Sequence, residues 1–341
     1  MRDYLKIYAI TALAILLSFV SAGLYQGPIS GDLTRLGYFA ERDFRPAGAP
    51  LVAVPFPSGD VVEVEVLGDS FSAHNYWQPF VENGALTSIA TTHWLSLSRP
   101  DCVLEWIRQA KEKNPALKVV VLQAVERAFV LRFEHLVQNC SGQRVRQTHQ
   151  ASGSGNTLGE RIGLLFPDPI YTLRAIGNSI KTFDSLESSG KVGVVPLIRN
   201  DLFTNQRSNK LLYFHGVDGD QVKLAWNQSQ VSTAARRLRE LQDSAAAFDV
   251  KILVAIIPDK STVYRPYMVV DPFEGFTMNV WAELNAAGVR QINVKDYLAR
   301  NVESTRDLYA PNDTHFGVSG YRLFAEQVRM SLLDLLAPRG P

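Results

Sequence analysis

A serine near the start of the chain and an aspartate–histidine pair near its end are the residues best suited to chemistry. Ser70 lies in a GDSF stretch, and Asp313 and His315 are separated by a single residue. A serine hydroxyl becomes a nucleophile when an imidazole takes its proton and a carboxylate holds the other ring nitrogen. We therefore predict covalent acyl transfer, with Ser70 as nucleophile, His315 as general base and Asp313 as the residue that orients the base.

The stretch before Ser70 predicts how the nucleophile is held. Valine recurs at every second position over 62–66, which is the period of a strand, and a helix is expected over about 75–82. The Ser70 N–H would then point out of a helix N-terminus and donate to an oxyanion. The plainer interpretation is that the turn at Ser70 and Asp313 near the last helix are only helix caps.

Further polar residues follow two apolar runs, 117–124 and 250–257, which predict buried parallel strands. The carboxyl ends of parallel strands gather at one sheet edge, where α/β proteins place their sites. We predict that this edge binds substrate, through Asp69, Glu126, Arg127, Lys260 and Tyr264. The alternatives are a salt bridge at a strand end, a Lys260–Glu126 pair, or a plain surface lysine.

Strands alternate with helices along the chain, so we expect an α/β fold: a three-layer parallel sheet with helices on both faces. A fourth strand is expected over 289–294, and helices are expected over 101–113, 231–248, 273–287 and 317–336. The domain is assigned to residues 59–338.

The alternation is lost over about 132–228, where the chain is polar and rich in glycine. A helix over 168–186 and a short strand over 210–215 are expected within it. An unpatterned run of this length inside a compact domain is unusual. We interpret it as an insertion that caps the site, the alternative being a partly disordered surface excursion.

The N-terminus predicts export. Basic residues precede an apolar run from Ile7 to about Tyr25, which has the features of a secretory signal or a membrane anchor. We favour an uncleaved anchor over residues 1–26, although Val20-Ser21-Ala22 is an acceptable cleavage site. A linker over 27–58 would follow it, with 39–44 packing on the domain.

Composition excludes some classes of function. The formal net charge of the 341-residue chain is +1, which gives no electrostatic footprint for nucleic acid. The six histidines show no ligand spacing with cysteine or acid, so neither metal nor cofactor is expected. An exported location permits a disulfide between Cys102 and Cys140; two separately buried thiols are the alternative.

Together these segments resemble a known superfamily. The stretches GDSFSAHNYW, VVVLQAVERAF, IIPDKSTVY and NDTHFGVSGY are similar to the SGNH/GDSL hydrolases, and more narrowly to the alginate O-acetylation proteins of the AlgX and AlgJ type. The similarity is patchy over roughly residues 60 to 335. In the alginate proteins the Asp-His segment precedes the serine segment, whereas here Ser70 comes first. No GxND block is visible, so we assign no residue of this chain to the role of the asparagine oxyanion donor of SGNH enzymes.

The resemblance implies a function and partners. It implies an O-acetyltransferase that acts on an exported polysaccharide through an acetyl-serine intermediate, in the periplasm or at the cell exterior. A multi-spanning membrane acyltransferase would supply the acetyl group, and the N-terminal segment would hold the chain at the inner membrane. The rivals are a secreted carbohydrate acetylesterase and a non-catalytic polysaccharide-binding or assembly protein on the same fold.

Overall fold

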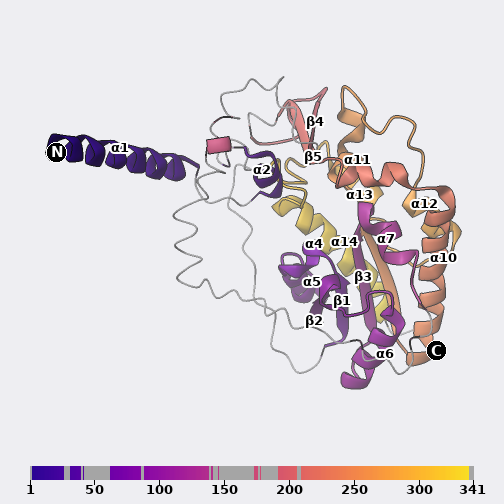
Figure 1. Cartoon of the computed structure of the whole chain (residues 1–341). Helices are drawn as coiled ribbons and strands as arrows, with labels where there is room; N and C mark the ends of the chain where they lie inside the picture. The colour runs from indigo at the N-terminus through magenta and orange to yellow at the C-terminus, as the bar shows by residue number, and fades with distance from the viewer. Residues whose placement is uncertain are drawn as a thin grey trace.

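A parallel sheet forms the centre of the molecule. The structure is a computed structural model that describes residues 2–26, 31–39, 41, 62–85, 88–137, 140, 145, 173–175, 177, 191–205 and 209–337. Four strands pair in the order β2-β1-β3-β6, all parallel (Figure 1). Their bounds are β1 Val64–Gly68, β2 Ile89–His93, β3 Val119–Val125 and β6 Lys251–Ile257.

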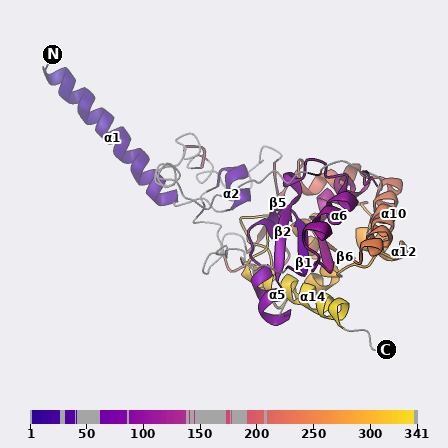
Figure 2. The same cartoon turned by 90° about the horizontal axis from the view of Figure 1, so that it is seen from below.

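Alternation along β3 accounts for the layers. Val119 and Val121 belong to one core cluster, and Val120 and Leu122 belong to the other, because successive side chains point to opposite faces. The first cluster includes side chains of α5 (Gln78–Ala85), α13 (Val294–Asn301) and α14 (Val318–Leu336). The second includes side chains of α6 (Val103–Lys113), α7 (Phe129–Phe133), α10 (Gln228–Ala245) and α12 (Val280–Ala286). The predicted α/β architecture, with helices on both faces of a parallel sheet, is confirmed (Figure 2).

Two strands differ from expectation. β2 was not predicted, because its sequence IATTH mixes polar and apolar residues and only its first residue is buried. Conversely, the strand expected over 289–294 is reduced to one parallel bridge between Val254 and Gln291. The reason is that Asn293 caps a helix there: its side chain accepts the Asp296 N–H, and α13 begins at Val294.

The helix expected over 273–287 is shorter than predicted. It begins only at Val280, after Gly275, which has a φ of 78°. This left-handed conformation suits glycine and interrupts a helix. Asn279 then starts α12 by accepting the Ala282 N–H.

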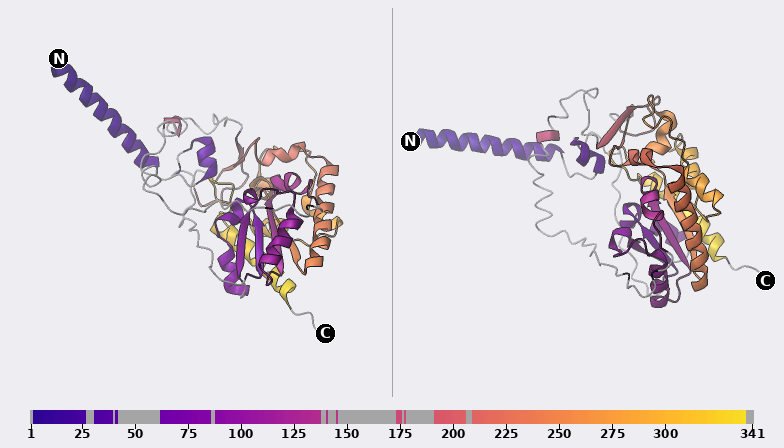
Figure 3. Two further views of the ribbon diagram at one scale, coloured as in Figure 1. Left: turned by 60° about the horizontal axis from the view of Figure 1, so that its bottom comes forward. Right: turned by 45° about the vertical axis from the view of Figure 1, so that its right-hand side comes forward.

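The N-terminal helix α1 (Arg2–Gln26) stands apart from the domain in both views of Figure 3. Many of its apolar side chains are more than half exposed, namely Tyr4, Leu5, Ile7, Tyr8, Ile10, Leu13, Ile15, Leu16 and Leu17. Within the residues that the structure describes, no helix combines the length and apolar character required to cross a bilayer. The membrane anchor therefore stays a prediction.

The segment expected to be an insertion contributes a β-hairpin. β4 (Val192–Pro196) and β5 (Leu211–His215) pair antiparallel, so the short strand expected over 210–215 is confirmed. The hairpin packs against α2 (Asp32–Gly37): Phe39, just after this helix, lies edge-on to Tyr213 with ring centroids 5.3 Å apart. The helix expected over 168–186 falls almost entirely outside the described residues.

A disulfide joins the two cysteines. Cys102, which immediately precedes α6, is bonded to Cys140, so the structure has the bond rather than two separate thiols. The bond is reinforced by the Val137 N–H, which donates to the Asp101 carbonyl at 2.8 Å. Together they attach the segment that follows α7 to the start of α6.

Removing this disulfide is expected to destabilise the fold. The half-cystines are 38 residues apart, and opening a loop of that length costs about 3–4 kcal/mol in unfolding free energy by the chain-entropy estimate. The measurement is the urea midpoint of the Cys102→Ser/Cys140→Ser protein against the oxidised wild type. Equal midpoints would show that the bond does not constrain the unfolded chain.

Candidate active site

The nucleophile turn is built where β1 meets β3. β1 ends at Gly68, and α4 (Ser70–Ala73) begins at Ser70. A side chain at Gly68 would place its Cβ 2.7 Å from the Ser72 Cβ and 2.8 Å from the Gln123 Oε1. Only glycine therefore lets the turn lie this close to β3.

The Gln123 side chain of β3 holds this turn through three hydrogen bonds. Its Oε1 accepts the Ser72 hydroxyl at 2.8 Å and the Asp69 N–H at 3.0 Å, and its Nε2 donates to the Asp69 Oδ1 at 2.9 Å. Asp69 also accepts the N–H groups of Phe71 and Val125. Both Asp69 oxygens thus accept donors from the protein, so Asp69 positions the turn. The substrate contact that we predicted for it stays a prediction.

The opposing loop brings the histidine to Ser70. The loop closes on itself through a bridge between Tyr309 and Phe316. The His315 Nε2 lies 2.7 Å from the Ser70 Oγ, and its Nδ1 lies 2.6 Å from the Asp313 Oδ1. The same Asp313 oxygen accepts the His315 N–H at 2.9 Å. The three side chains therefore form one hydrogen-bonded line.

Packing fixes the ring as well. The Phe71 ring lies against the His315 ring with centroids 4.7 Å apart. Phe71 itself packs edge-on to Phe316 with centroids 5.1 Å apart. The imidazole is thus held by hydrogen bonds at its two nitrogens and by an aromatic contact, which limits its rotation.

Charge within the line favours the protonated histidine. Burial alone would lower the pKa of His315, but its hydrogen bond to Asp313 and the charge of that carboxylate raise it above 6.5. Burial alone would raise the pKa of Asp313, but its hydrogen bonds with His315 and the histidine's charge lower it to about 2. Asp313 is therefore ionised at any pH near neutrality and can stabilise an imidazolium.

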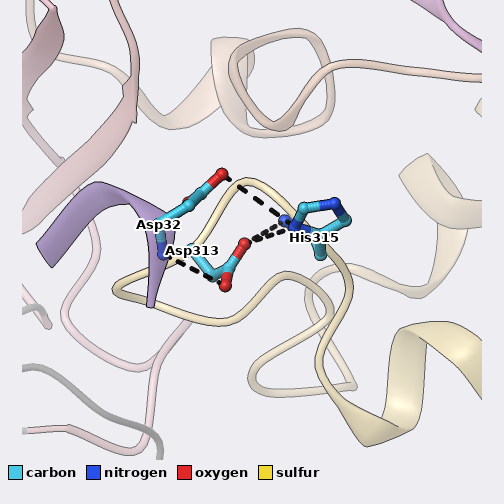
Figure 4. A group of neighbouring side chains, drawn as sticks. All are labelled: Asp32, Asp313 and His315. Atoms are coloured by element: carbon cyan, nitrogen blue, oxygen red, sulfur yellow. Dashed lines mark hydrogen bonds and ion pairs between the residues drawn. The ribbon is translucent and has the colours of Figure 1, made fainter. Parts of the chain in front are cut away.

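An aspartate from the N-terminal segment joins this group. Asp32, the first residue of α2, has an Oδ2 3.9 Å from the His315 Nδ1, and its N–H donates to the Asp313 Oδ2 at 3.3 Å (Figure 4). The segment 27–58 was expected to be a linker. The structure instead places residues 31–39 against the site, where Leu33 and Phe39 are buried in a cluster with β4 and β5.

Lys260 lies beneath the histidine loop. Its side chain is 1% exposed, and its Nζ donates to the carbonyls of Ala310, Pro311 and Asp313 at 2.7, 2.9 and 3.2 Å. Burial lowers the pKa of Lys260 to about 7, against the attraction of nearby carboxylates led by Asp313. Neither predicted role is available to Lys260: it is too buried to bind substrate, and it pairs with loop carbonyls instead of Glu126.

Glu126 belongs to a buried ionic network. Its partner is Lys223, with an N–O separation of 3.3 Å, and it also accepts the Asp259 N–H and the Thr262 hydroxyl. Arg127 pairs with Asp259 at 2.5 Å and with Asp220 at 3.3 Å. Glu126 is 3% exposed, so the salt-bridge alternative holds in place of the predicted substrate contact.

Tyr264 is also buried, with 0% exposure, and stacks on Phe203 with ring centroids 5.0 Å apart. The predicted substrate contact is therefore not available to Tyr264 either. Phe203 lies in the segment expected to be an insertion, so described parts of that segment do pack behind the histidine loop.

A cavity of about 390 Å³ lies away from Ser70. It is lined by side chains that include Glu126, Lys223, Arg265, Phe276 and Trp281. Ser70 and His315 are not among its lining residues. The cavity therefore does not define the space beside the nucleophile.

The described residues contain one group with the composition of a metal site. Ligand atoms of Asp32, Asp313 and His315 lie within 4.8 Å of one another. Hydrogen bonds already account for this closeness: the His315 Nδ1 is bonded to Asp313, and Asp32 accepts both donors of Thr314. A cation there would displace the contacts that orient the imidazole, so we assign no metal to the group.

Comparison with known proteins identifies part of the chain. Residues 213–338 match the family described as the SGNH hydrolase-like domain of the acetyltransferase AlgX. No curated protein matches the chain. The matched residues include the Asp313–His315 loop and Lys260. Ser70 lies outside them, at the start of α4, just after β1. This match supports the resemblance predicted from the motifs: residues 213–338 are similar to the SGNH hydrolase-like domain of the AlgX type.

Proposed function

We propose that the protein is an exported, membrane-associated O-acetyltransferase that modifies a polysaccharide through an acetyl-Ser70 intermediate. The observation that carries the proposal is the hydrogen-bonded line from Asp313 through His315 to Ser70. The similarity of residues 213–338 to an SGNH hydrolase-like acetyltransferase domain supports acetyl chemistry on a polysaccharide.

In the first half-reaction, the His315 Nε2 takes the Ser70 proton while the Ser70 Oγ bonds to the carbonyl carbon of the acetyl donor. Ser70 opens α4, so its N–H has no acceptor within the helix and is our proposed oxyanion donor. The tetrahedral intermediate then expels the donor's leaving group, which takes the proton from His315. Asp313 stabilises the imidazolium between these two proton transfers.

The second half-reaction reverses these roles. A hydroxyl of the acceptor sugar gives its proton to His315 and bonds to the acetyl carbon. The Ser70 Oγ leaves and regains the proton, so the enzyme returns to its starting state. Water in place of the sugar would give an acetylesterase with the same residues, and the choice of acceptor is what an experiment must measure.

The membrane part of the proposal rests on α1. Its exposed apolar side chains need a cover that the described residues do not supply in this structure. Gln26 at the end of α1 and Asp32 in the site are six positions apart, a span of at most about 22 Å when fully extended. An anchored α1 would therefore hold Ser70 close to the bilayer, where a multi-spanning acyltransferase could deliver the acetyl group.

The test uses the purified full chain with a chromogenic acetyl ester and intact-mass measurement. We expect an acetyl adduct on Ser70 that persists in water and moves to added oligosaccharides, with no adduct on the Ser70→Ala protein. Rapid ester turnover without sugar would identify an acetylesterase. Carbohydrate binding that survives Ser70→Ala, without any adduct or turnover, would instead identify a non-catalytic binding protein.

A further inference from the structure

We propose that Asp32 is a second carboxylate of the active site, a positioning residue that holds the Asp313–His315 turn and favours the protonated imidazole during turnover. The inference rests on the proposed acyl transfer at Ser70. Asp32 comes from α2, 281 positions before Asp313, and lies outside the segments that carry the family resemblance.

Asp32 brackets the histidine turn from two sides. Its Oδ1 accepts the Thr314 N–H at 2.8 Å, and its Oδ2 accepts the Thr314 hydroxyl at 2.5 Å. In return, its N–H donates to the Asp313 Oδ2 at 3.3 Å. Because the other Asp313 oxygen is bonded to His315, the Asp313 carboxylate has donors on both of its oxygens and its orientation is fixed (Figure 4).

The start of α2 is itself fixed to the loop. The N–H groups of Leu33 and Thr34 donate to the Asn312 carbonyl at 3.1 and 3.3 Å. Glu41 joins the Asn312 amide to the Gly31 N–H, with distances of 2.9 and 3.2 Å. A Cβ at Gly31 would lie 2.3 Å from the Asn312 carbonyl oxygen, so the two segments are in direct backbone contact. This is a specific docking rather than a chance approach of a surface loop.

The placement of the Asp32 charge suggests an electrostatic role. Its Oδ2 is 3.9 Å from the His315 Nδ1, too far for a hydrogen bond but near enough for strong attraction to an imidazolium. Three other titratable groups interact with His315. The charges of Asp313 and Asp69 raise the pKa of His315. The charge of His315 in turn lowers the pKa of His74. Asp32 is thus one of the carboxylates whose charge stabilises the imidazolium that forms when the His315 Nε2 takes the Ser70 proton.

The proton equilibria of these groups support the electrostatic role. Burial, reinforced by the charge of Asp313, raises the pKa of Asp32 to about 6, while His315 and Thr314 lower it. Lys260 lies beneath the same loop and is also attracted to Asp32. Asp32 is therefore ionised at neutral pH. As the pH falls through about 6 it takes up a proton, and its help to the His315 cation is lost.

The experiment is an NMR titration of the imidazole resonances in the full-length chain. The chain has six histidines, and a His315→Asn protein assigns the one of interest. In Asp32→Asn the pKa of His315 is expected to fall by about 1 unit, since a carboxylate within 4–6 Å shifts a pKa by roughly that amount or more. Turnover is expected to fall about tenfold. Asp218→Asn, the same change at an exposed position, should leave both unchanged.

A second variant separates charge from hydrogen bonding. Thr314→Val removes the hydroxyl that donates to Asp32 but keeps the carboxylate, so the pKa of His315 should fall less than in Asp32→Asn. If Asp32→Asn leaves that pKa unchanged, or if Thr314→Val lowers it equally, Asp32 is only a structural contact and the inference is wrong. The titration needs no turnover: a lowered pKa without any acetyl transfer would support Asp32's role and refute the proposed reaction instead.

Discussion

Replacing Ser70 by alanine is expected to lower kcat/KM for acetyl-ester turnover about 10³-fold or more. The hydroxyl that would attack the ester lies 2.7 Å from the His315 Nε2, and no other serine in the described residues is bonded to that histidine. The neighbouring Ser72 is fully buried and bonded to Gln123, so it cannot replace the nucleophile. Residual activity would come only from the oxyanion donor and from substrate binding.

The loss should leave the fold intact. Asp69 still accepts the Phe71 N–H and still holds the Val125 N–H, so the turn keeps its anchors when the Ser70 hydroxyl is removed. The measurement is kcat/KM with a chromogenic ester, with Ser304→Ala as a control because Ser304 is an exposed serine outside the site. Wild-type turnover in Ser70→Ala would mean that another residue forms the acyl-enzyme, or that no acyl-enzyme exists.

Two strands of the sheet, β3 and β6, were predictable from sequence because both of their faces are buried and mostly apolar. β3 is apolar except for Gln123, β6 is apolar after Lys251, and almost every side chain of both strands is buried. Short runs of this kind are typical of a parallel sheet that helices cover on both sides. β2 lies at an edge and includes polar threonines, so neither apolar run nor alternation marks it. The hydrophobic pattern therefore predicts the fully buried strands better than the half-buried β2.

One positioning residue was visible in the sequence and was missed. Gln123 is the one polar residue in VVVLQAV, and a buried amide inside such a strand needs several hydrogen-bond partners. Its partners are the Ser72 hydroxyl and the backbone and side chain of Asp69. The exception to the apolar pattern was therefore the signal that β3 supports the nucleophile turn.

The ionic network could not be predicted. Charges after β3 and β6 stand at the sheet edge where substrates bind, but their partners Asp220 and Lys223 come from η4 (Asp220–Ala225), in a segment without a readable pattern. Without the partners, a charge that faces substrate and a charge that is neutralised inside the protein look alike. Asp32 is harder still, since α2 has only six residues and lies in a stretch rich in glycine and proline.

Replacing Asp313 by asparagine is expected to lower kcat by about 10⁴-fold, more than its small change in shape suggests. The carboxylate accepts on both oxygens: Oδ1 faces the His315 ring and N–H, and Oδ2 faces the Asp32 N–H. An amide has one oxygen and one NH₂ group, so either orientation sets a donor against a donor. When the NH₂ group faces the His315 Nδ1, it favours the His315 tautomer that carries its proton on Nε2. That tautomer cannot take a proton from Ser70.

The pH dependence gives the second measurement on this variant. Asp313 raises the pKa of His315 above 6.5 in the native protein, so wild-type kcat/KM should rise with pH through that raised value as the imidazole becomes neutral. In Asp313→Asn the ascending limb should move to lower pH while the plateau falls. Asp249→Asn is a suitable control, because Asp249 is exposed and its φ of 55° is tolerated by asparagine.

The same pair makes a pH-dependent contribution to stability. The lowered pKa of Asp313 adds stability above pH 3.8 that is lost as the pH falls toward 2, and the raised pKa of His315 adds stability below pH 6.5 that is lost as the pH rises through its folded-state value. The native pair is therefore most stabilising between about pH 4 and 6.5. Asp313→Asn should abolish this contribution, so the unfolding free energy of the wild type minus that of the variant should be largest in this pH range. If Asp313→Asn changes neither the pH of the ascending limb of kcat/KM nor the pH dependence of the unfolding free energy, Asp313 does not act on His315 in solution.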